Sequence, residues 1–224
     1  SSVGGKAAVN HPQGKNLIGA FYQPRVVVAD TQVLTTLPGR ELVSGWAEVI
    51  KHAMIRDARL LELLEQQAEG LLTLERSVTS DVVARSAAIK AKIVSEDEKE
   101  QGIRIILNYG HTIAHGLETA TNYERFLHGE AVAIGMMGAA MISREVGLLF
   151  QEVVDRQKAL LARFGLPTTF SGVDIERLLQ ATELDKKVRG KTVRWVLLRG
   201  IGQPVVRDDV HRDVAVSVIK KLLK

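Results

Sequence analysis

The sequence predicts a mainly α-helical protein with short strands at its N-terminus and a β-hairpin near its C-terminus. Three observations predict this fold class. Apolar residues recur at helical spacing over most of residues 41–182, β-branched residues cluster between turn formers before residue 37, and a Gly- and Pro-containing turn separates two short apolar runs near residue 200. Strand signals give way to helical ones at Leu37-Pro38-Gly39, so we expect a strand-rich unit at 1–37 and a helical unit at 38–224.

The expected strands are bounded by turn-forming residues. Asn16–Phe21 surrounds a glycine, and Arg25–Asp30 follows Pro24. Near the C-terminus, Thr192–Arg199 and Val205–Arg207 are joined at Gly200–Pro204, a segment with two glycines and a proline. We expect these last two runs to form the β-hairpin.

Helices are expected from the spacing of apolar residues. In 41–56 these residues recur at i, i+4, i+7 and i+11, and they are Leu42, Trp46, Val49 and Ala53. Gly165-Leu166-Pro167 is a helix stop. Further helical patterns cover 58–75, 81–96, 103–120, 128–146, 151–164 and 174–182, with a last helix from about 211.

The composition excludes several classes of function. The 224 residues include 30 Lys+Arg and 26 Asp+Glu, a net charge of +4, and 46% are hydrophobic, which is typical of a soluble globular protein. There is no cysteine, so any metal has to be bound by His, Asp or Glu. Dispersed basic residues and 4% aromatic residues argue against a nucleic-acid partner. The longest uncharged apolar stretch, Ala131–Ser143, is shorter than the ~20 residues of a membrane span. We expect no membrane contact and a cytoplasmic location.

Three of the six histidines fall within 18 residues. A helix over 103–120 would place five polar residues on one stripe, namely Arg104, Asn108, His111, His115 and Glu118. The other faces are apolar, so a mostly buried helix would have to satisfy the stripe with partners, a ligand or water. An ordinary amphipathic helix with solvated histidines is the alternative.

His128 and Glu48 extend this set of metal-ligand candidates. His128 is expected at the start of a buried helix, where the helix dipole disfavours a protonated imidazole and leaves a neutral nitrogen for a metal. A helix cap or a core hydrogen bond is the alternative role. Glu48 lies on a polar stripe of its helix. The alternative is that this stripe is simply the solvent-exposed side of the helix. Two histidines and one carboxylate, with positions left open, form the ligand set of catalytic zinc sites.

Basic residues suggest an anionic substrate. Lys6 and Lys15 lie in a Gly-rich segment, Lys51 and Lys90 lie on two predicted helices, and Asp185–Lys191 forms a basic turn. Cations clustered beside a metal suit a phosphate or a carboxylate. A solvated surface charge is the alternative explanation for each of them.

Short motifs along nearly the whole chain match one enzyme family. In order they are Ser1–Lys6, Gly14–Phe21, Gln23–Pro24, Leu37–Pro38, Arg40–Glu41, Ala47–Lys51, Asp97–Glu98, Gly102–Arg104, Leu107–Thr112, His128–Ala133 and Asp185–Lys187. The sequence therefore resembles 3-dehydroquinate synthase of the shikimate pathway. The resemblance implies the multihelical C-terminal domain of that fold, with residues 1–37 as the remnant of its N-terminal nucleotide-binding domain.

The resemblance also implies roles for individual residues. The metal, zinc or cobalt, would be bound by Glu48, His111 and His128. The substrate contacts would be Lys6, Asn16, Lys51, Lys90, Arg104, Asn108, His115 and Lys186, of which His115, Lys90, Arg104 and Lys51 would be catalytic. NAD would lie near Lys6, Lys15, Val33, Leu34, Thr35 and Thr36.

The implied reaction converts 3-deoxy-D-arabino-heptulosonate 7-phosphate to 3-dehydroquinate and phosphate. A metal would lower the pKa of the hydroxyl that NAD oxidises, and cationic side chains would hold the phosphate and the carboxylate. His115 would relay protons or bind phosphate. We expect a carbon–oxygen lyase, a small anionic sugar-acid phosphate as its partner, and a homodimer.

Two alternatives remain open. One is another sugar-phosphate cyclase, or a metal-dependent polyol dehydrogenase of the same superfamily, which typically has Asp where Glu48 stands. The other is a non-catalytic helical module of a larger protein. Because the sequence contains no Gly-rich dinucleotide turn of the family's nucleotide-binding domain, we expect little synthase activity from this chain alone.

Overall fold

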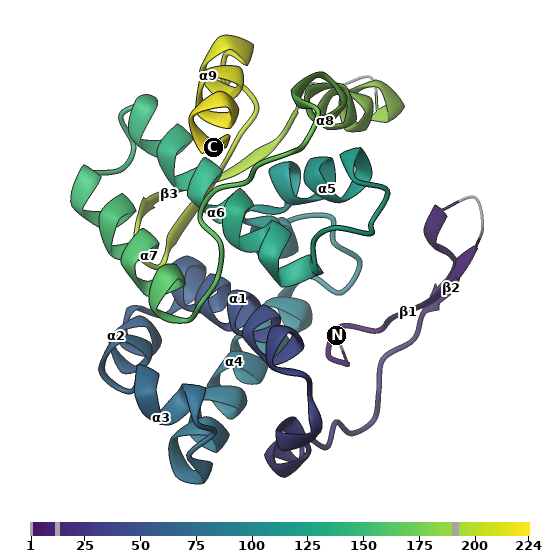
Figure 1. The fold of residues 1–224 in the computed structure, drawn as a ribbon. Coiled ribbons are helices and arrows are strands. Elements are labelled where there is room, and N and C mark those ends of the chain that lie inside the picture. Colours follow the sequence, from purple (N-terminus) through teal and green to yellow (C-terminus); the bar gives the residue numbers. More distant parts are fainter. Residues whose placement is uncertain (1, 12–13, 190–192) are drawn as a thin grey trace.

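A computed structural model describes residues 2–11, 14–189 and 193–224, with side chains described at 2–9, 17–182 and 193–224. Helices dominate, and two short antiparallel hairpins lie towards the two ends of the chain (Figure 1), which confirms the expected fold class. The helices are α1 (Gly39–Arg56), α2 (Ala58–Gln66), α3 (Ala68–Leu72), α4 (Arg76–Glu96), α5 (His111–Ala120), α6 (His128–Glu145), α7 (Gln151–Arg163), α8 (Ile175–Arg189) and α9 (Arg212–Leu222). The strands are β1 (Lys6–His11), β2 (Gly14–Phe21), β3 (Trp195–Gly200) and β4 (Gln203–Arg207), and the 3-10 helices are η1 (Thr31–Thr36) and η2 (Ile103–Asn108).

Helix α6 is the centre of the helical body. Residues 131–140 are all buried, and α6 packs against α1, α5, α7, α9 and β3 (Figure 1). Two of its glycines allow very close packing. A Cβ atom on Gly129 would lie 1.9 Å from the carbonyl oxygen of Ser44 in α1, and one on Gly135 would lie 2.0 Å from the carbonyl oxygen of Gly110. The Gly- and Ala-rich stretch is therefore a buried helix, as expected, and its glycines bring α1 and the start of α5 against it.

The predicted helix over 103–120 is wrong in its middle. The 3-10 helix η2 ends at Asn108 and α5 begins at His111, with Gly110 at a left-handed φ of +82°. A Cβ atom at Gly110 would lie 2.7 Å from the backbone nitrogen of Met136 in α6. The chain therefore turns here to pack against α6, and the five polar residues expected on one stripe belong to two separate elements.

Other expected elements differ mainly at their ends. The helix expected over 58–75 is divided into α2 and α3, and α4 begins five residues before the expected residue 81. Helix α8 continues beyond residue 182 to Arg189. The C-terminal hairpin is confirmed as β3 and β4, although Thr192 lies outside the described residues. No described helix is both long and apolar enough to cross a membrane.

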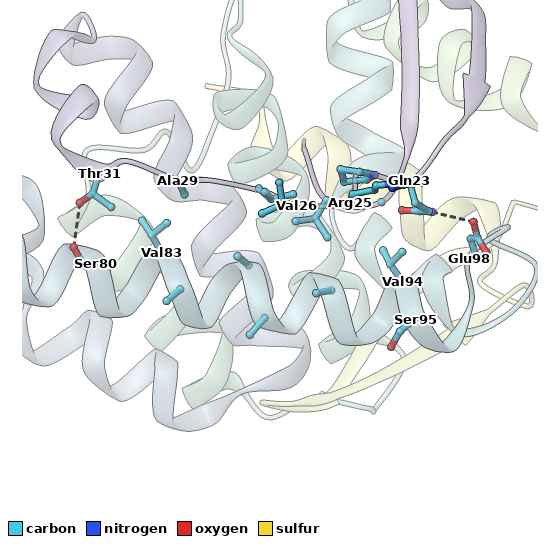
Figure 2. Close-up of a pocket in the computed structure, with 18 residues that line it drawn as sticks. Gln23, Arg25, Val26, Ala29, Thr31, Ser80, Val83, Val94, Ser95 and Glu98 are labelled. Atoms are coloured by element: carbon cyan, nitrogen blue, oxygen red, sulfur yellow. Dashed lines mark hydrogen bonds between the residues drawn. The ribbon is translucent and has the colours of Figure 1, made fainter.

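The strand expected at Arg25–Asp30 is also wrong. The segment pairs with no strand among the described residues. It runs beside α4 and is held at both ends (Figure 2). Thr31 Oγ1 lies 3.0 Å from Ser80 Oγ in α4, and Gln23 Nε2 lies 3.3 Å from Glu98 Oε1 just after α4. Eight extended steps reach about 26 Å, close to the rise of about 24 Å along α4 from Ser80 to its end. The β-branched sequence makes the segment extended, but a strand also needs a paired neighbour.

Gly135→Ala should destabilise the protein, because the added methyl group meets the backbone of Gly110 and cannot be accommodated by a side-chain rotation. Overpacking of this kind costs about 1–3 kcal/mol or more. The matched control is Gly45→Ala in the exposed interior of α1, where an added Cβ has no atom within 4 Å. The control should gain about 0.5–1 kcal/mol, because alanine favours the helix. Urea denaturation measures both, and a Gly135→Ala protein as stable as wild type would contradict this packing.

Candidate metal centre and anion site

Three side chains from three helices converge at one point. They are Glu48 on α1 and the first residues of α5 and α6, His111 and His128. Their candidate ligand atoms all lie within 4.8 Å of one another. Glu48 Oε1 lies 3.7 Å from His111 Nε2 and 3.7 Å from His128 Nε2. The structure thus brings together the three residues expected to bind a metal.

Local capping fixes the start of α6, and with it His128. Glu130 accepts the backbone N–H of Leu127 at 2.9 Å, which satisfies an otherwise unpaired donor at the helix start. Arg40 of α1 donates to both oxygens of Glu130 at 2.7 Å each. The backbone N–H of Gly129 donates to Ser44 Oγ at 3.1 Å. The start of α6 is therefore attached to α1 one helical turn before Glu48.

The orientation of both histidines leaves the same ring nitrogen available. His111 Nδ1 lies 3.3 Å from the carbonyl oxygen of Tyr109, and His128 Nδ1 lies 3.2 Å from Glu118 Oε1. Both partners are acceptors, so each Nδ1 carries the proton and donates. The Nε2 atom of each ring then lies on the side of Glu48, which is the arrangement typical of metal-bound histidines. Burial, followed by the nearby charge of Lys51, holds the pKa of His111 well below its usual range, so this imidazole is neutral at pH 7.

The carboxylate of Glu48 has one oxygen with no protein partner. Its Oε2 accepts a hydrogen bond from Lys51 Nζ at 2.6 Å, whereas Oε1 is buried without a hydrogen-bond partner among the described residues, although the side chain is 36% exposed. Burial raises the pKa of Glu48, but the neighbouring charge of Lys51 and its hydrogen bond to the carboxylate lower it more, so the group is ionised. An unpaired buried oxygen of this kind costs about 1–3 kcal/mol or more. A divalent cation would satisfy this oxygen and both Nε2 lone pairs, so the donor set fits zinc with an open position.

Basic groups surround Glu48. Lys51 is 3% exposed. Burial lowers the pKa of Lys90, and the positive charges of Lys51 and Arg104 lower it further, while the charge of Glu48 opposes them. Lys6 also contributes to this lowering. The charges of Glu48, Lys51, Arg104 and Lys6 therefore all act on Lys90.

Arg104 is buried and holds two backbone segments. Its guanidinium donates to the carbonyl oxygen of Glu98 at 2.6 Å and to that of Gly4 at 2.9 Å. Asp97 accepts the backbone N–H of Arg104 at 3.0 Å, and backbone hydrogen bonds of this kind lower the pKa of Asp97. Arg104 thereby attaches the loop after α4 to the loop before Lys6.

Several sequence candidates are placed less directly. His115 lies one turn after His111 on α5, with ring centroids 5.4 Å apart. The residues expected near NAD lie apart. Lys6 pairs with Glu100, beyond the C-terminal end of α4. The 3-10 helix η1 begins at Thr31, beside Ser80 near the other end of α4, and it contains Val33, Leu34, Thr35 and Thr36. The side chains of Lys15, Asn16 and Lys186 lie outside the described residues.

Three residues of this region have contacts for which the sequence predicts no role. Glu118 is buried and orients His128, and a position on the expected polar stripe was its only signal. Glu100 pairs with Lys6 and accepts from Asn108 Nδ2 at 3.5 Å, so its carboxylate contacts two residues expected to bind substrate. His52 is buried behind Lys51. Nothing in their spacing distinguishes these residues from ordinary surface charges.

Two solved enzyme structures share this fold. A 2-epi-5-epi-valiolone synthase from Streptomyces hygroscopicus subsp. jinggangensis with NAD+ and Zn2+ bound aligns with a TM-score of 0.89 and 26% identity, over 99% of this chain and 62% of that one. A 2-deoxy-scyllo-inosose synthase complexed with carbaglucose-6-phosphate, NAD+ and Co2+ aligns with a TM-score of 0.82 and 29% identity, over 96% and 62%. The fold of this chain is that of the sugar-phosphate cyclases.

Sequence families give a finer assignment. Residues 45–188 match the family described as 3-dehydroquinate synthase C-terminal, and residues 1–44 match 3-dehydroquinate synthase N-terminal. The chain belongs to the 3-dehydroquinate synthase family, which confirms the resemblance. The 3-dehydroquinate synthases of Nitrosospira multiformis and Nostoc punctiforme are 48% and 49% identical to it, over 100% and 98% of this chain. The chain spans only 60% and 61% of their lengths.

The metal-free protein should lose stability as the pH falls from about 7 to about 5. Burial, followed by the charge of Lys51, lowers the pKa of His52 from 6.5 to about 3, so the unfolded chain takes up a proton before the folded one does. The contribution is complete above the unfolded pKa and is lost as the pH falls toward the folded pKa, by about 2 kcal/mol at pH 5 for this group. Urea denaturation at both pH values measures the loss. His52→Phe should make it smaller, and an equal loss in that variant would contradict the assignment.

Proposed function

We propose that this chain is the metal- and substrate-binding part of a 3-dehydroquinate synthase. The complete protein would convert 3-deoxy-D-arabino-heptulosonate 7-phosphate to 3-dehydroquinate and phosphate with NAD and a divalent metal, as a carbon–oxygen lyase. The observation that supports this best is the unpartnered Glu48 Oε1 between His111 Nε2 and His128 Nε2, in a chain of this family. A homodimer in the cytoplasm is part of the proposal.

The three converging residues would bind zinc or cobalt. When bound, the metal would lower the pKa of the substrate hydroxyl that is oxidised and polarise the resulting carbonyl. Lys51 holds Glu48 Oε2 and thereby turns Oε1 toward the two histidines. Glu118 and the carbonyl oxygen of Tyr109 fix the two imidazole rings. The metals bound in the two solved relatives, Zn2+ and Co2+, support this choice.

The cations beside this centre would bind the anionic groups of the substrate. Lys90 is a candidate for the departing phosphate, because it lies close enough to Glu48 for their charges to interact. Lys6 and Asn108 already hold a carboxylate, that of Glu100, and a substrate carboxylate would have the same chemistry. His115 would relay protons or bind phosphate. Arg104 would act partly by ordering the loop that precedes Lys6.

The N-terminal unit would belong to a nucleotide-binding domain. Apolar side chains of 1–37 are unusually exposed, including Leu17, Tyr22, Val26 and Val28. A further layer of structure would cover them, and the relatives are longer than this chain. The described residues do not by themselves form a dinucleotide cradle, so we assign Lys6, Lys15 and Val33–Thr36 to NAD only in the complete protein.

A second candidate function is another sugar-phosphate cyclase. The solved structures that share the fold are synthases of this kind, which favours it. Their identities of 26% and 29% are well below the 48% of the curated 3-dehydroquinate synthase, so we prefer the latter. A non-catalytic helical module is disfavoured because it would not need an unpaired buried carboxylate oxygen.

Metal analysis tests the proposed centre. The chain dialysed against zinc should retain close to one zinc per molecule, and Glu48→Ala should lose it, because two histidines alone leave the set incomplete. Glu41→Ala is the matched control, since Glu41 is an exposed carboxylate at the start of the same helix. Atomic absorption after gel filtration gives the stoichiometry. A wild-type chain without zinc, or a Glu48→Ala chain that keeps it, would contradict the proposal.

Phosphate release tests the reaction. With NAD and zinc, the chain extended by its own upstream coding sequence should release phosphate from 3-deoxy-D-arabino-heptulosonate 7-phosphate at ~1 s⁻¹ or faster, and not from glucose 6-phosphate. The 224-residue chain alone should release little. Release from glucose 6-phosphate only would instead support the second candidate. Turnover by the chain alone at the enzymatic rate would show that it needs no further domain.

A further inference from the structure

A buried polar bridge joins the two helices that carry Glu48 and Lys90. His52 of α1 and Ser86 of α4 are 5% and 8% exposed, and His52 Nδ1 lies 2.8 Å from Ser86 Oγ. Residues four apart on a helix lie on the same face. The bridge is therefore one turn from Glu48 on α1 and one turn from Lys90 on α4.

Stability alone does not explain this bridge. Nε2 of His52 is buried and has no hydrogen-bond partner among the described residues, so the pair leaves one polar atom unsatisfied. Two apolar side chains of similar shape would avoid that penalty and would be at least as stable. Burial, followed by the charge of Lys51, lowers the pKa of His52 to about 3, so the bridge is a neutral hydrogen bond at pH 7 and not an ion pair. A buried neutral hydrogen bond of this kind specifies which residues pack together more than it stabilises the fold.

The bridge also lies where α4 has few other anchors. Within α4, all of whose residues the structure describes, Ser86 is the only buried residue between Val82 and Ile93, and Ile89 is partly buried against the core. That stretch includes Lys90. The opposite side of the same stretch, including Ala84 and Ala91, lines an open groove of about 690 Å³ beneath the Gln23–Thr31 segment (Figure 2). The contacts that set the position of Lys90 relative to α1 therefore include the His52–Ser86 hydrogen bond and the packing of Ile89, and the Arg56–Glu96 ion pair, at 3.9 Å, joins the two helices at the end of α4.

We propose that the His52–Ser86 hydrogen bond is a positioning contact that holds Lys90 at a fixed place relative to Glu48 and the metal centre. The inference rests on the proposed function, because it assumes that a metal binds at Glu48 and that Lys90 acts beside it. His52 and Ser86 are positioning residues and touch neither the metal nor the substrate. Breaking the bridge should leave metal affinity unchanged and should shift Lys90.

Paramagnetic NMR of the full chain measures both quantities. Lysines are reductively methylated with ¹³C, the chain is loaded with Co2+ or with diamagnetic Zn2+, and Lys90→Arg identifies the Lys90 signal. In wild type this signal should differ clearly between the cobalt and zinc forms. In Ser86→Ala the difference should shrink or the signal should broaden, because α4 is no longer held in register. Cobalt affinity, measured by chelator competition, should stay within about twofold of wild type, since the ligands keep their own contacts.

The chain offers a matched control and a second variant. Thr79 is another buried hydroxyl on α4, and its Oγ1 has no hydrogen-bond partner among the described residues, so Thr79→Val should leave the Lys90 signal as in wild type. His52→Phe breaks the bridge from the other side, and His52→Phe/Ser86→Ala should shift the signal no further than either single change.

Two results distinguish a failure of the proposed metal centre from a failure of the positioning role. If wild type binds no cobalt, the proposed metal centre fails, and the inference that depends on it fails too. If wild type binds cobalt and the Lys90 shift is the same in Ser86→Ala and His52→Phe as in wild type, the proposed function stands and the positioning role is overturned. An equal change in Thr79→Val would also overturn it, because any cavity in α4 would then have the same effect.

Discussion

The close approach of α1, α5 and α6 determines the rest of this structure. Gly129 and Gly135 of α6 lie so near the carbonyl oxygens of Ser44 and Gly110 that no side chain could replace their hydrogen atoms without a clash. The first contact lies beside His128 and one turn before Glu48, and the second lies beside His111. Because the backbones themselves touch, the three candidate ligands are held within reach of one ion without relying on flexible side chains.

The charges of the site are costly without a ligand. An anionic oxygen of Glu48 is buried unpaired, His111 is kept neutral, and Lys51 and Lys90 lie nearby against their mutual repulsion. Proteins violate the rules of polar burial mainly at functional sites, where a bound group later supplies the missing partner. A divalent cation would complete the ligand atoms and an anionic substrate would offset the lysines. The three candidate ligands therefore require a cation from solution, and the lysines beside them require an anion.

The sequence predicted the helical unit and the three converging residues, because apolar spacing and ligand chemistry are local properties. It could not predict the helix break at Gly110, which depends on packing against α6. Nor could it predict that Arg25–Asp30 lacks a strand partner, because pairing is a property of the assembled chain. Glu118 was visible only as a polar residue of the stripe, since its role requires the position of His128. The roles of the three converging residues as ligands remain a prediction.

Helix α4 lies between the Gln23–Thr31 segment and α1. Thr31 bonds to Ser80 of α4 and Gln23 bonds to Glu98 just after it (Figure 2). The other side of α4 is bound to α1 through the bridge at Ser86. Lys90 lies on this helix, close enough to Glu48 for their charges to interact. A shift of the Gln23–Thr31 segment would act on α4 directly, and the His52–Ser86 bridge would help to keep Lys90 beside Glu48. A movement of residues 1–37 would therefore reach the candidate metal centre along at least two routes, through α4 with its contacts to α1 and through the loop that Arg104 attaches to Gly4.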